Sequence, residues 1–248
     1  MIPWEGPLPE PGARRLADMA DVLAAPEYAD RDPSRPLYYM YRDCARSDED
    51  RRWLADHDVR YDITVIMPGV IGPELVKTKG HYHPENPAGV GFPEVYEVMS
   101  GRAHFLLQNR EASSVLFVEA TAGEVVVIPP GYGHVTINPG DEDLVMANLV
   151  STAFASEYAP YARLGGAAYY EMEDGSIVKN NRYPDAGPVR RAVALPVPAF
   201  GTGPGVPLYT LLGREESVRF LNHPEDYADA FSGCLRDAGE VSVCAQMP

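Results

Sequence analysis

From residue 60 to residue 150 the chain is a succession of short segments rich in Val, Ile and aromatic residues, separated by turns that contain Gly or Pro. Segments of this length and composition are typical of β-strands. No helical pattern alternates with them, so a parallel sheet is not expected. The sequence therefore predicts an all-β fold, a double-sheet jelly roll. The predicted strands are 60–68, 94–101, 103–109, 113–120, 124–130, 134–138 and 144–150.

Proline is abundant along the whole chain. It accounts for 24 of the 248 residues, against about 5% in an average protein. Because proline cannot donate a hydrogen bond within a central strand, a proline-rich chain suits short strands joined by many turns. The composition therefore agrees with a jelly roll.

The charge and the cysteines narrow the class of protein. The formal net charge of −15 argues against a nucleic-acid partner and against docking on an anionic membrane. Cys44, Cys234 and Cys244 lack metal-type spacing and fit a reducing compartment. The N-terminal stretch has no apolar signal-peptide core, and no run of residues reaches membrane-spanning length. We therefore expect a cytoplasmic protein.

The segment before the predicted strands contains less regular elements. Residues 1–12 are rich in proline and predict an arm lying on a neighbouring surface. The apolar spacing of residues 13–25 predicts a helix, and residues 37–44 predict a strand. A short helix is expected over 48–57, capped by Ser47.

The segment after the predicted strands changes in composition. Residues 167–181 predict a hairpin that turns at Asp174-Gly175, and residues 184–210 carry repeated Pro and Gly, which predicts an extended path. Residues 211–232 predict one weak helix, at 223–231. We divide the chain into an N-terminal arm with helices and a strand, a barrel and a Pro/Gly-rich C-terminal extension, at residues 1–59, 60–183 and 184–248.

Histidines and a carboxylate stand at the ends of several predicted segments. His81 and His83 alternate along an extended segment, so their side chains point to the same side. Glu94 begins a later strand, and His134 follows a Pro-Pro-Gly turn. Three histidines and one carboxylate suit one divalent first-row metal with open coordination positions, Fe²⁺, Mn²⁺, Ni²⁺, Co²⁺ or Zn²⁺. No such pattern includes the other histidines, which we expect to be ordinary surface or packed residues: His57, His104 and His223.

Two stretches of the sequence resemble the signature motifs of the cupin superfamily. The second motif, GEVVVIPPGYGHVTIN at 123–138, matches at every fixed position, and the first begins at His81. The first motif has a longer gap before its glutamate than cupins usually have. The resemblance implies a metal-binding barrel of the jelly-roll type.

Three glutamates compete for the ligand position in the first motif. Glu94 is favoured because it stands seven positions before Gly101, as the cupin pattern requires. Glu85 lies nearer to the histidines but within a loop segment. Glu97 falls on the strand face opposite to that of Glu94 and Tyr96.

A more specific resemblance lies in the segments KTKGHYH (77–83) and EVYEVMSG (94–101). Together with the second cupin motif they resemble the cupin-type glucose-6-phosphate isomerases of archaea and some bacteria, over about residues 37–183. The family implies an enzyme of glycolysis and gluconeogenesis. The implied metal ligands are His81, His83, Glu94 and His134, and the implied contacts to the substrate phosphate are Thr64, Thr78, Gly80 and Tyr96.

The resemblance also implies the chemistry, which interconverts an aldose phosphate and a ketose phosphate by moving hydrogen between C1 and C2. A metal bound to the two substrate oxygens would polarise the carbonyl group and stabilise an enediolate. Glu94 is either the catalytic base or only a metal ligand, in which case a hydride shift moves the hydrogen. Tyr158 is expected to orient water or a sugar hydroxyl.

Two lysines next to the first histidine suggest how an acidic protein could bind a phosphosugar. Lys77 and Lys79 flank Thr78 directly before Gly80. Two cations, a hydroxyl and a glycine N–H predict a local anion site. A metal-dependent dioxygenase would use the same ligand set, but its chemistry does not call for such a site.

The chain departs from the family pattern at two positions that concern ring opening. Val150 and Ser156 stand where family members carry Tyr and His. The exact sugar is therefore open, and an isomerase of another phosphosugar, such as mannose 6-phosphate, is an alternative. A non-catalytic sugar-binding cupin is a second alternative. We further expect a homodimer.

Overall fold

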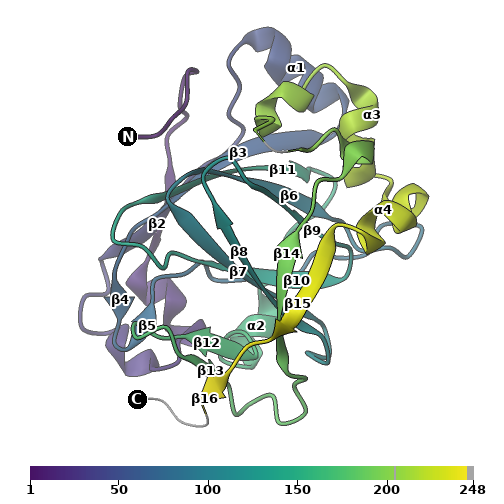
Figure 1. Ribbon diagram of the computed structural model, residues 1–248. Coiled ribbons are helices and arrows are strands. Elements are labelled where there is room, and N and C mark those ends of the chain that lie inside the picture. Colours follow the sequence, from purple (N-terminus) through teal and green to yellow (C-terminus); the bar gives the residue numbers. More distant parts are fainter. Residues whose placement is uncertain (204, 245–248) are drawn as a thin grey trace.

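Two large sheets form the body of the structure, a computed structural model that describes residues 1–203 and 205–244 (Figure 1). The first sheet has the order β1 (Gly12–Arg15), β2 (Pro36–Tyr41), β3 (Val59–Ile66), β11 (Leu144–Ser151), β6 (Glu94–Ser100) and β9 (Val125–Ile128). The second has the order β10 (Tyr132–Ile137), β7 (Arg102–Asn109), β8 (Val115–Thr121), β14 (Val189–Ala194) and β15 (Leu235–Glu240). The predicted strands between residues 60 and 150 all occur, and the all-β, double-sheet prediction is confirmed.

Smaller elements surround the two sheets. One small sheet contains β12 (Tyr169–Glu171), β13 (Ile177–Lys179) and β16 (Val243–Cys244), and another contains β4 (Val70–Ile71) and β5 (Glu74–Leu75). The α-helices are α1 (Asp48–Asp56), α2 (Ala159–Arg163), α3 (Glu215–Val218) and α4 (Ala228–Ser232). The 3₁₀ helices are η1 (Leu16–Val22), η2 (Pro26–Tyr28), η3 (Pro198–Phe200), η4 (Leu208–Leu211), η5 (Arg219–Leu221) and η6 (Pro224–Tyr227). Within the described ranges, none of the helices has both the length and the apolar character needed to span a bilayer.

The register of the first sheet decides which side chains share its inner face. Val150 of β11 lies opposite Arg60 of β3 on one side and opposite Glu94 of β6 on the other. Two residues earlier, Asn148 lies opposite Asp62. Because side chains alternate along a strand, these residues point to one face of the sheet, and they all line one pocket or lie directly behind it.

A tight turn at the end of β6 joins the two sheets. β6 turns into β7 at Gly101, which has a φ of +86°. A Cβ atom at this position would lie 3.2 Å from the backbone oxygen of Asp143. Both the backbone angle and the close approach therefore require glycine here.

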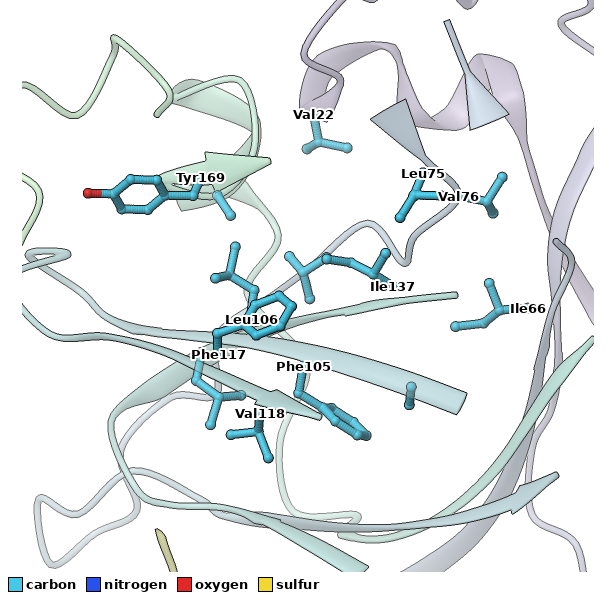
Figure 2. Packing of buried hydrophobic residues seen from close by; sticks show 14 of the residues in the cluster. Val22, Ile66, Leu75, Val76, Phe105, Leu106, Phe117, Val118, Ile137 and Tyr169 are labelled. Atoms are coloured by element: carbon cyan, nitrogen blue, oxygen red, sulfur yellow. The ribbon is translucent and has the colours of Figure 1, made fainter. Parts of the chain in front are cut away.

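Apolar side chains fill the space between the sheets. Phe105 and Val118 from the second sheet and Ile66 from the first belong to one buried cluster (Figure 2). Leu106, on the opposite face of β7, packs in the same cluster with Tyr169 of β12. Burying a side chain of this size contributes roughly 1.5–3 kcal/mol, so this cluster contributes substantially to the stability of the barrel.

A second buried cluster covers the outer face of the first sheet. Val95 and Leu149 pack there against aromatic residues of the C-terminal segment. Among these, the rings of Phe200 and Phe220 stack with a centroid separation of 3.9 Å. The C-terminal segment is therefore packed on the barrel rather than extended away from it.

The helix predicted over residues 13–25 is wrong. Residues 12–15 form β1, which pairs with β2, and residues 16–22 form the 3₁₀ helix η1. The buried residues of η1 are Leu16, Met19 and Val22. Their spacing of three is the period of a 3₁₀ helix, in which residues i and i+3 lie on one side. The helix expected at 48–57 is confirmed, with Ser47 Oγ accepting from Asp50 N at 3.1 Å.

The C-terminal prediction is partly wrong. The hairpin at 167–181 is confirmed as β12 and β13, with Gly175 at φ +79°. The segment 184–210 contains β14, which pairs in parallel with β8, and 211–232 contains several short helices instead of one. The strand β15 was not expected. The part of the predicted extension at 204 and 245–248 lies outside the described residues, and the division of the chain into three parts stays a prediction.

Candidate metal centre and its pocket

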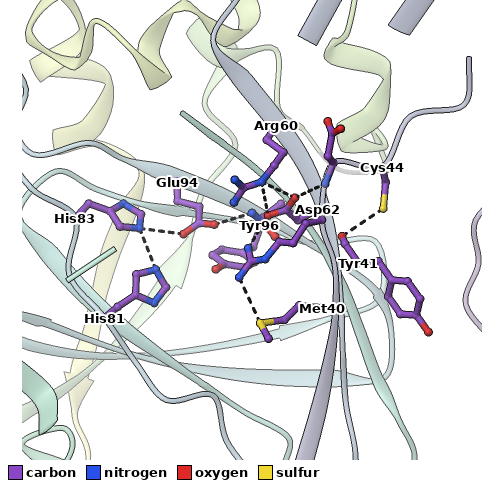
Figure 3. Close-up of polar contacts among 12 residues, drawn as sticks. Met40, Tyr41, Cys44, Arg60, Asp62, His81, His83, Glu94 and Tyr96 are labelled. Carbon is purple, nitrogen blue, oxygen red and sulfur yellow. Dashed lines mark hydrogen bonds and ion pairs between the residues drawn. The ribbon is translucent and has the colours of Figure 1, made fainter. Parts of the chain in front are cut away.

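Four side chains meet inside one end of the barrel, from three separate segments. Glu94 starts β6, His134 lies on β10, and His81 forms a β-bridge with His134, so that His83 follows on the same side. The ligand atoms of all four residues lie within 4.8 Å of one another. Figure 3 shows His81, His83 and Glu94 turned toward a common point.

The distances describe a set of ligands that converge on a cation. Oε2 of Glu94 is 3.4 Å from Nε2 of His83 and 3.3 Å from Nε2 of His134, and Nε2 of His81 is 3.1 Å from Nε2 of His83. Glu94 is buried, yet Oε2 has no hydrogen-bond partner of good geometry in the described structure. A buried, unpaired carboxylate oxygen is costly unless it is compensated. A divalent cation among three imidazole nitrogens would compensate it, so the residues present fit such an ion.

Neighbouring groups hold the candidate ligands in orientation. Nδ1 of His83 lies 2.9 Å from the carbonyl oxygen of Phe92, which leaves Nε2 directed to the centre. Asn148 Nδ2 donates to Oε1 of Glu94 at 2.7 Å, which leaves Oε2 as the free oxygen. Such outer partners fix the orientation of ligands in metal sites.

The environment also sets the charge of the ligands. Burial, with His134 and His83 close by, holds the pKa of His81 well below its usual range, and burial lowers the pKa of His134. Burial alone would raise the pKa of Glu94, but the polar contacts from His134 and His83 hold it well below its usual range. Neutral histidines beside an ionised carboxylate are the protonation states that metal binding requires.

The cluster opens into a pocket that contains every residue assigned to the site from the sequence. Thr64, Thr78, Gly80, Tyr96 and Tyr158 line it with the four candidate ligands. The other lining residues are Tyr38, Met40, Arg42, Arg60, Lys79, Asn148, Val150 and Ser156.

Close contacts fix several of these residues. Oγ1 of Thr78 accepts from the N–H of Thr136 at 2.9 Å, and Gly80 has a φ of +75°. The ring of Tyr158 lies 5.3 Å from that of His81 between centroids. The hydroxyl of Tyr96 is 3.1 Å from Nε2 of His134, and burial together with the charge of Glu94 raises its pKa well above the usual value. Tyr96 is therefore an uncharged donor.

The two competing glutamates lie elsewhere. Glu97 accepts from the N–H of Leu208 at 2.6 Å, on the face of β6 opposite to Glu94. Glu85 is exposed in the segment between His83 and β6. The three remaining histidines are also outside the cluster: His57 contacts Trp53 O, His104 pairs with Glu171, and His223 lies beside Glu225.

The prediction that Lys77 supplies charge to an anion site is wrong, whereas Lys79 lines the pocket with its charge paired to a carboxylate. The ammonium group of Lys77 is buried and pairs with Glu74, and it also donates to Val22 O at 2.8 Å. The ammonium group of Lys79 pairs with Asp21 at 2.7 Å. Both lysines therefore fasten neighbouring segments to the barrel.

Sequence reasoning missed the arginines of the pocket. Arg60 and Asp62 precede Thr64 at intervals of two, so strand parity already assigns all three to one face. Arg42 could not be found in this way, because it reaches Asp62 only through the pairing of β2 with β3. Arg42 and Arg60 therefore join Lys79 as the arginine and lysine side chains of the pocket wall.

Comparisons with known proteins show what the chain is similar to. A model of the family described as glucose-6-phosphate isomerase (GPI) matches residues 13–187. Glucose-6-phosphate isomerase of Thermococcus litoralis is 30% identical over 165 residues, which cover 66% of this chain and 82% of that protein. The enzyme of the same name from Thermococcus onnurineus is 31% identical over 175 residues, covering 67% and 85%, and that of Pyrococcus furiosus is 30% identical over 177 residues, covering 68% and 86%. The chain belongs to the glucose-6-phosphate isomerase (GPI) family, in its cupin-type branch.

Proposed function

We propose that this protein is a metal-dependent aldose–ketose isomerase that interconverts glucose 6-phosphate and fructose 6-phosphate. The observation that carries the proposal is the convergence of four ligand atoms within 4.8 Å in a chain of this family. The relatives named above are glucose-6-phosphate isomerases by name. Together these findings favour the isomerase over a sugar-binding protein without catalysis.

One divalent ion would be held by His81, His83, Glu94 and His134, and the ligand set suits Fe²⁺, Mn²⁺, Ni²⁺, Co²⁺ or Zn²⁺. When bound, such an ion polarises the substrate carbonyl group and stabilises negative charge on the adjacent oxygens. The orphaned Oε2 of Glu94 supports this assignment.

The phosphate end of the substrate is assigned to Thr64, Thr78, Gly80 and Tyr96. Their common position on the pocket wall supports the assignment. The hydroxyl of Thr78 accepts one hydrogen bond and keeps its own hydrogen to donate. The Tyr96 hydroxyl is engaged with Nε2 of His134 and would be released for the substrate if that nitrogen held a metal.

Isomerisation requires one hydrogen to move between C2 and C1 and one hydroxyl proton to move between O2 and O1. In the first route Glu94 takes the proton from C2 of the aldose and returns it to C1, through an enediolate of the substrate. In the second route Glu94 only holds the metal, and the hydrogen moves as hydride. Tyr158, next to His81, is proposed to orient a water molecule or a sugar hydroxyl in either route.

Two residues of the pocket favour a second candidate substrate. Val150 and Ser156 line the pocket at positions where a Tyr and a His are expected from the family pattern. The change removes an aromatic hydroxyl and an imidazole from the sugar's surroundings, which supports activity on another phosphosugar such as mannose 6-phosphate. Relative rates on a panel of hexose 6-phosphates separate the two substrates.

A coupled assay tests the proposed function. Fructose 6-phosphate is added to protein loaded with each of the five metals, and glucose 6-phosphate is measured with a dehydrogenase. We expect product with at least one metal and none after chelation. Metal-loaded protein that gives no product with any metal would exclude the glucose-6-phosphate isomerase and leave the isomerase of another phosphosugar and the sugar-binding cupin as candidates.

The oligomeric state, the cellular compartment and the partners are proposed from the sequence alone. We propose a homodimer in the cytoplasm, with a phosphosugar as its substrate and without nucleic-acid or membrane partners. Light scattering coupled to gel filtration tests the dimer, and a mass equal to one chain of 27.2 kDa would contradict it.

A further inference from the structure

A buried carboxylate holds two arginines against the pocket wall. Asp62 on β3 is fully buried. Its Oδ2 accepts from Nη1 of Arg42 at 2.6 Å, and its two oxygens accept from Nε of Arg60 at 2.7 and 2.9 Å. The N–H of Asp43 donates to the same carboxylate at 2.9 Å. Figure 3 shows Arg60 and Asp62 beside Tyr96 and Glu94.

The charge of this group is not balanced. Two guanidinium groups share one carboxylate, so a net positive charge of one remains. Although burial alone would lower the pKa of Arg42, the charge of Asp62 raises it, so this cation stays protonated. Asp62 therefore fixes the arginines without neutralising both.

Each arginine keeps a part of its guanidinium group available. Arg60 contacts Asp62 only through Nε, and Arg42 does so only through Nη1, while Nη2 of Arg42 contacts the sulfur of Met40. The side chains of Arg42 and Arg60 are 46% and 33% exposed, and both line the pocket. Asp62 is the only carboxylate paired with either arginine in the described part of the chain.

The sheet places this charge at the metal end of the pocket. Arg60 lies opposite Val150, which lies opposite Glu94 on the next strand. Neighbouring strands are about 4.8 Å apart, so the backbone of Arg60 is about 10 Å from that of Glu94. The apolar side chain of Val150 lies between Arg60 and Glu94, and the carboxylate of Glu94 is the further negative charge that raises the pKa of Arg42.

We propose that Arg42 and Arg60, fixed by Asp62, form an oxyanion-binding subsite that recognises a phosphate or carboxylate group of a sugar ligand. Guanidinium groups present paired N–H donors that match the geometry of both oxyanions. A carboxylate that already fixes two arginines reduces the entropy that their ordering would cost on binding. The inference rests on the proposed function for the class of ligand, since it concerns the same pocket.

Two sources can supply the oxyanion, and three ligands distinguish them. Glucitol 6-phosphate carries only the phosphate, gluconate carries only a carboxylate at the other end, and 6-phosphogluconate carries both. The first variant is Arg60→Met, which leaves Arg42 paired with Asp62. The second is the double change Arg42→Met with Asp62→Asn, which removes the buried carboxylate of Asp62 together with its partner Arg42. Arg219→Met is the matched control, because Arg219 forms an exposed pair with Asp226 at 2.9 Å away from the pocket.

Calorimetric titration of Mn²⁺-loaded protein at constant ionic strength measures the affinities. We expect both pocket variants to weaken at least one of the single-anion ligands by about tenfold or more, the scale of one charge-assisted hydrogen bond, and Arg219→Met to change nothing. A loss of affinity for glucitol 6-phosphate would show that the arginines bind the phosphate group. A loss of affinity confined to gluconate and 6-phosphogluconate would show that they bind the carboxylate group. Folded variants that bind all three ligands as tightly as the unaltered protein would overturn the subsite.

The experiment separates this inference from the proposed function. Arginine-dependent binding in a protein without isomerase activity would retain the subsite and reject the isomerase. Normal isomerase activity combined with arginine-independent binding would reject only the subsite.

Discussion

Replacing Asn148 by alanine isolates the part of the site that holds Glu94 in place. Nδ2 of Asn148 donates to Oε1 of Glu94 at 2.7 Å, and the two residues are 2% and 3% exposed. Water cannot readily replace a partner at this depth, so Oε1 would lose a hydrogen bond to a charged group, worth roughly 1.5–3 kcal/mol. We expect the metal-free protein to lose about that much free energy of unfolding. Because outer partners of metal ligands typically control about 10–100-fold in affinity, we also expect metal binding to weaken on that scale.

Competition with a chelator of known affinity measures the metal binding, and urea unfolding of the chelated protein measures stability. Asn180→Ala is the matched control, since Asn180 is 5% exposed and donates to two carbonyl oxygens, Leu164 O at 2.8 Å and Ala167 O at 2.9 Å, outside the pocket. The control should lose stability but keep its metal affinity. Equal metal affinity in the two variants would refute the view that Asn148 orients the ligand.

Four further outcomes are expected. Elemental analysis should find about one divalent ion per chain. The double change His81→Ala and His134→Ala removes two of the four converging ligands and should abolish metal binding. Full metal occupancy in that variant would disprove the site. Glu94→Gln should retain part of the metal but lose turnover if Glu94 is the base, and solvent deuterium in the product would support proton transfer. Thr78→Val should weaken fructose 6-phosphate binding by roughly 1.5–3 kcal/mol without changing metal content. Thr78→Ser keeps the hydroxyl and should bind fructose 6-phosphate as the unaltered protein does. Unchanged binding by the valine variant would exclude a phosphate contact. The metal-free protein should lose stability as pH falls below about 6.5. The pKa values of His81 and His134 are lowered in the folded protein, so the unfolded chain binds more protons in this pH range. Urea titrations that show no loss of stability would contradict these shifts.

The alternation of side chains along a strand was sufficient to predict the part of the site that lies within single segments. The alternation of His81 and His83, and the separation of Glu94 from Glu97, follow from the two-residue period of a strand. The structure has Glu94 in the cluster and Glu97 on the other face. The short predicted strands were found for the same reason, since their pattern is local.

The parts that sequence reasoning missed depend on contacts between distant segments. Lys77 and Lys79 form ion pairs with Glu74 and Asp21. The positions of these two carboxylates follow from how β5 and η1 pack, which the sequence pattern does not show. Arg42 became a pocket residue through the pairing of β2 with β3. The N-terminal apolar spacing could not distinguish a 3₁₀ helix from an α-helix, because residues three apart share a face in both.

The pairing of β14 with β8 has a consequence for the order in which the chain can fold. The second sheet needs Val189–Ala194 to cover one edge of Val115–Thr121, although β7 and β10 on its other side are already made. During synthesis at roughly 5–20 residues per second, that edge stays open for several seconds, with unpaired N–H and C=O groups that can template association with another chain. The family match ends at residue 187, just before β14 begins. In this chain the strand that covers the edge of β8 comes from residues beyond the family match, so protection of that edge waits for a segment made well after β8 itself.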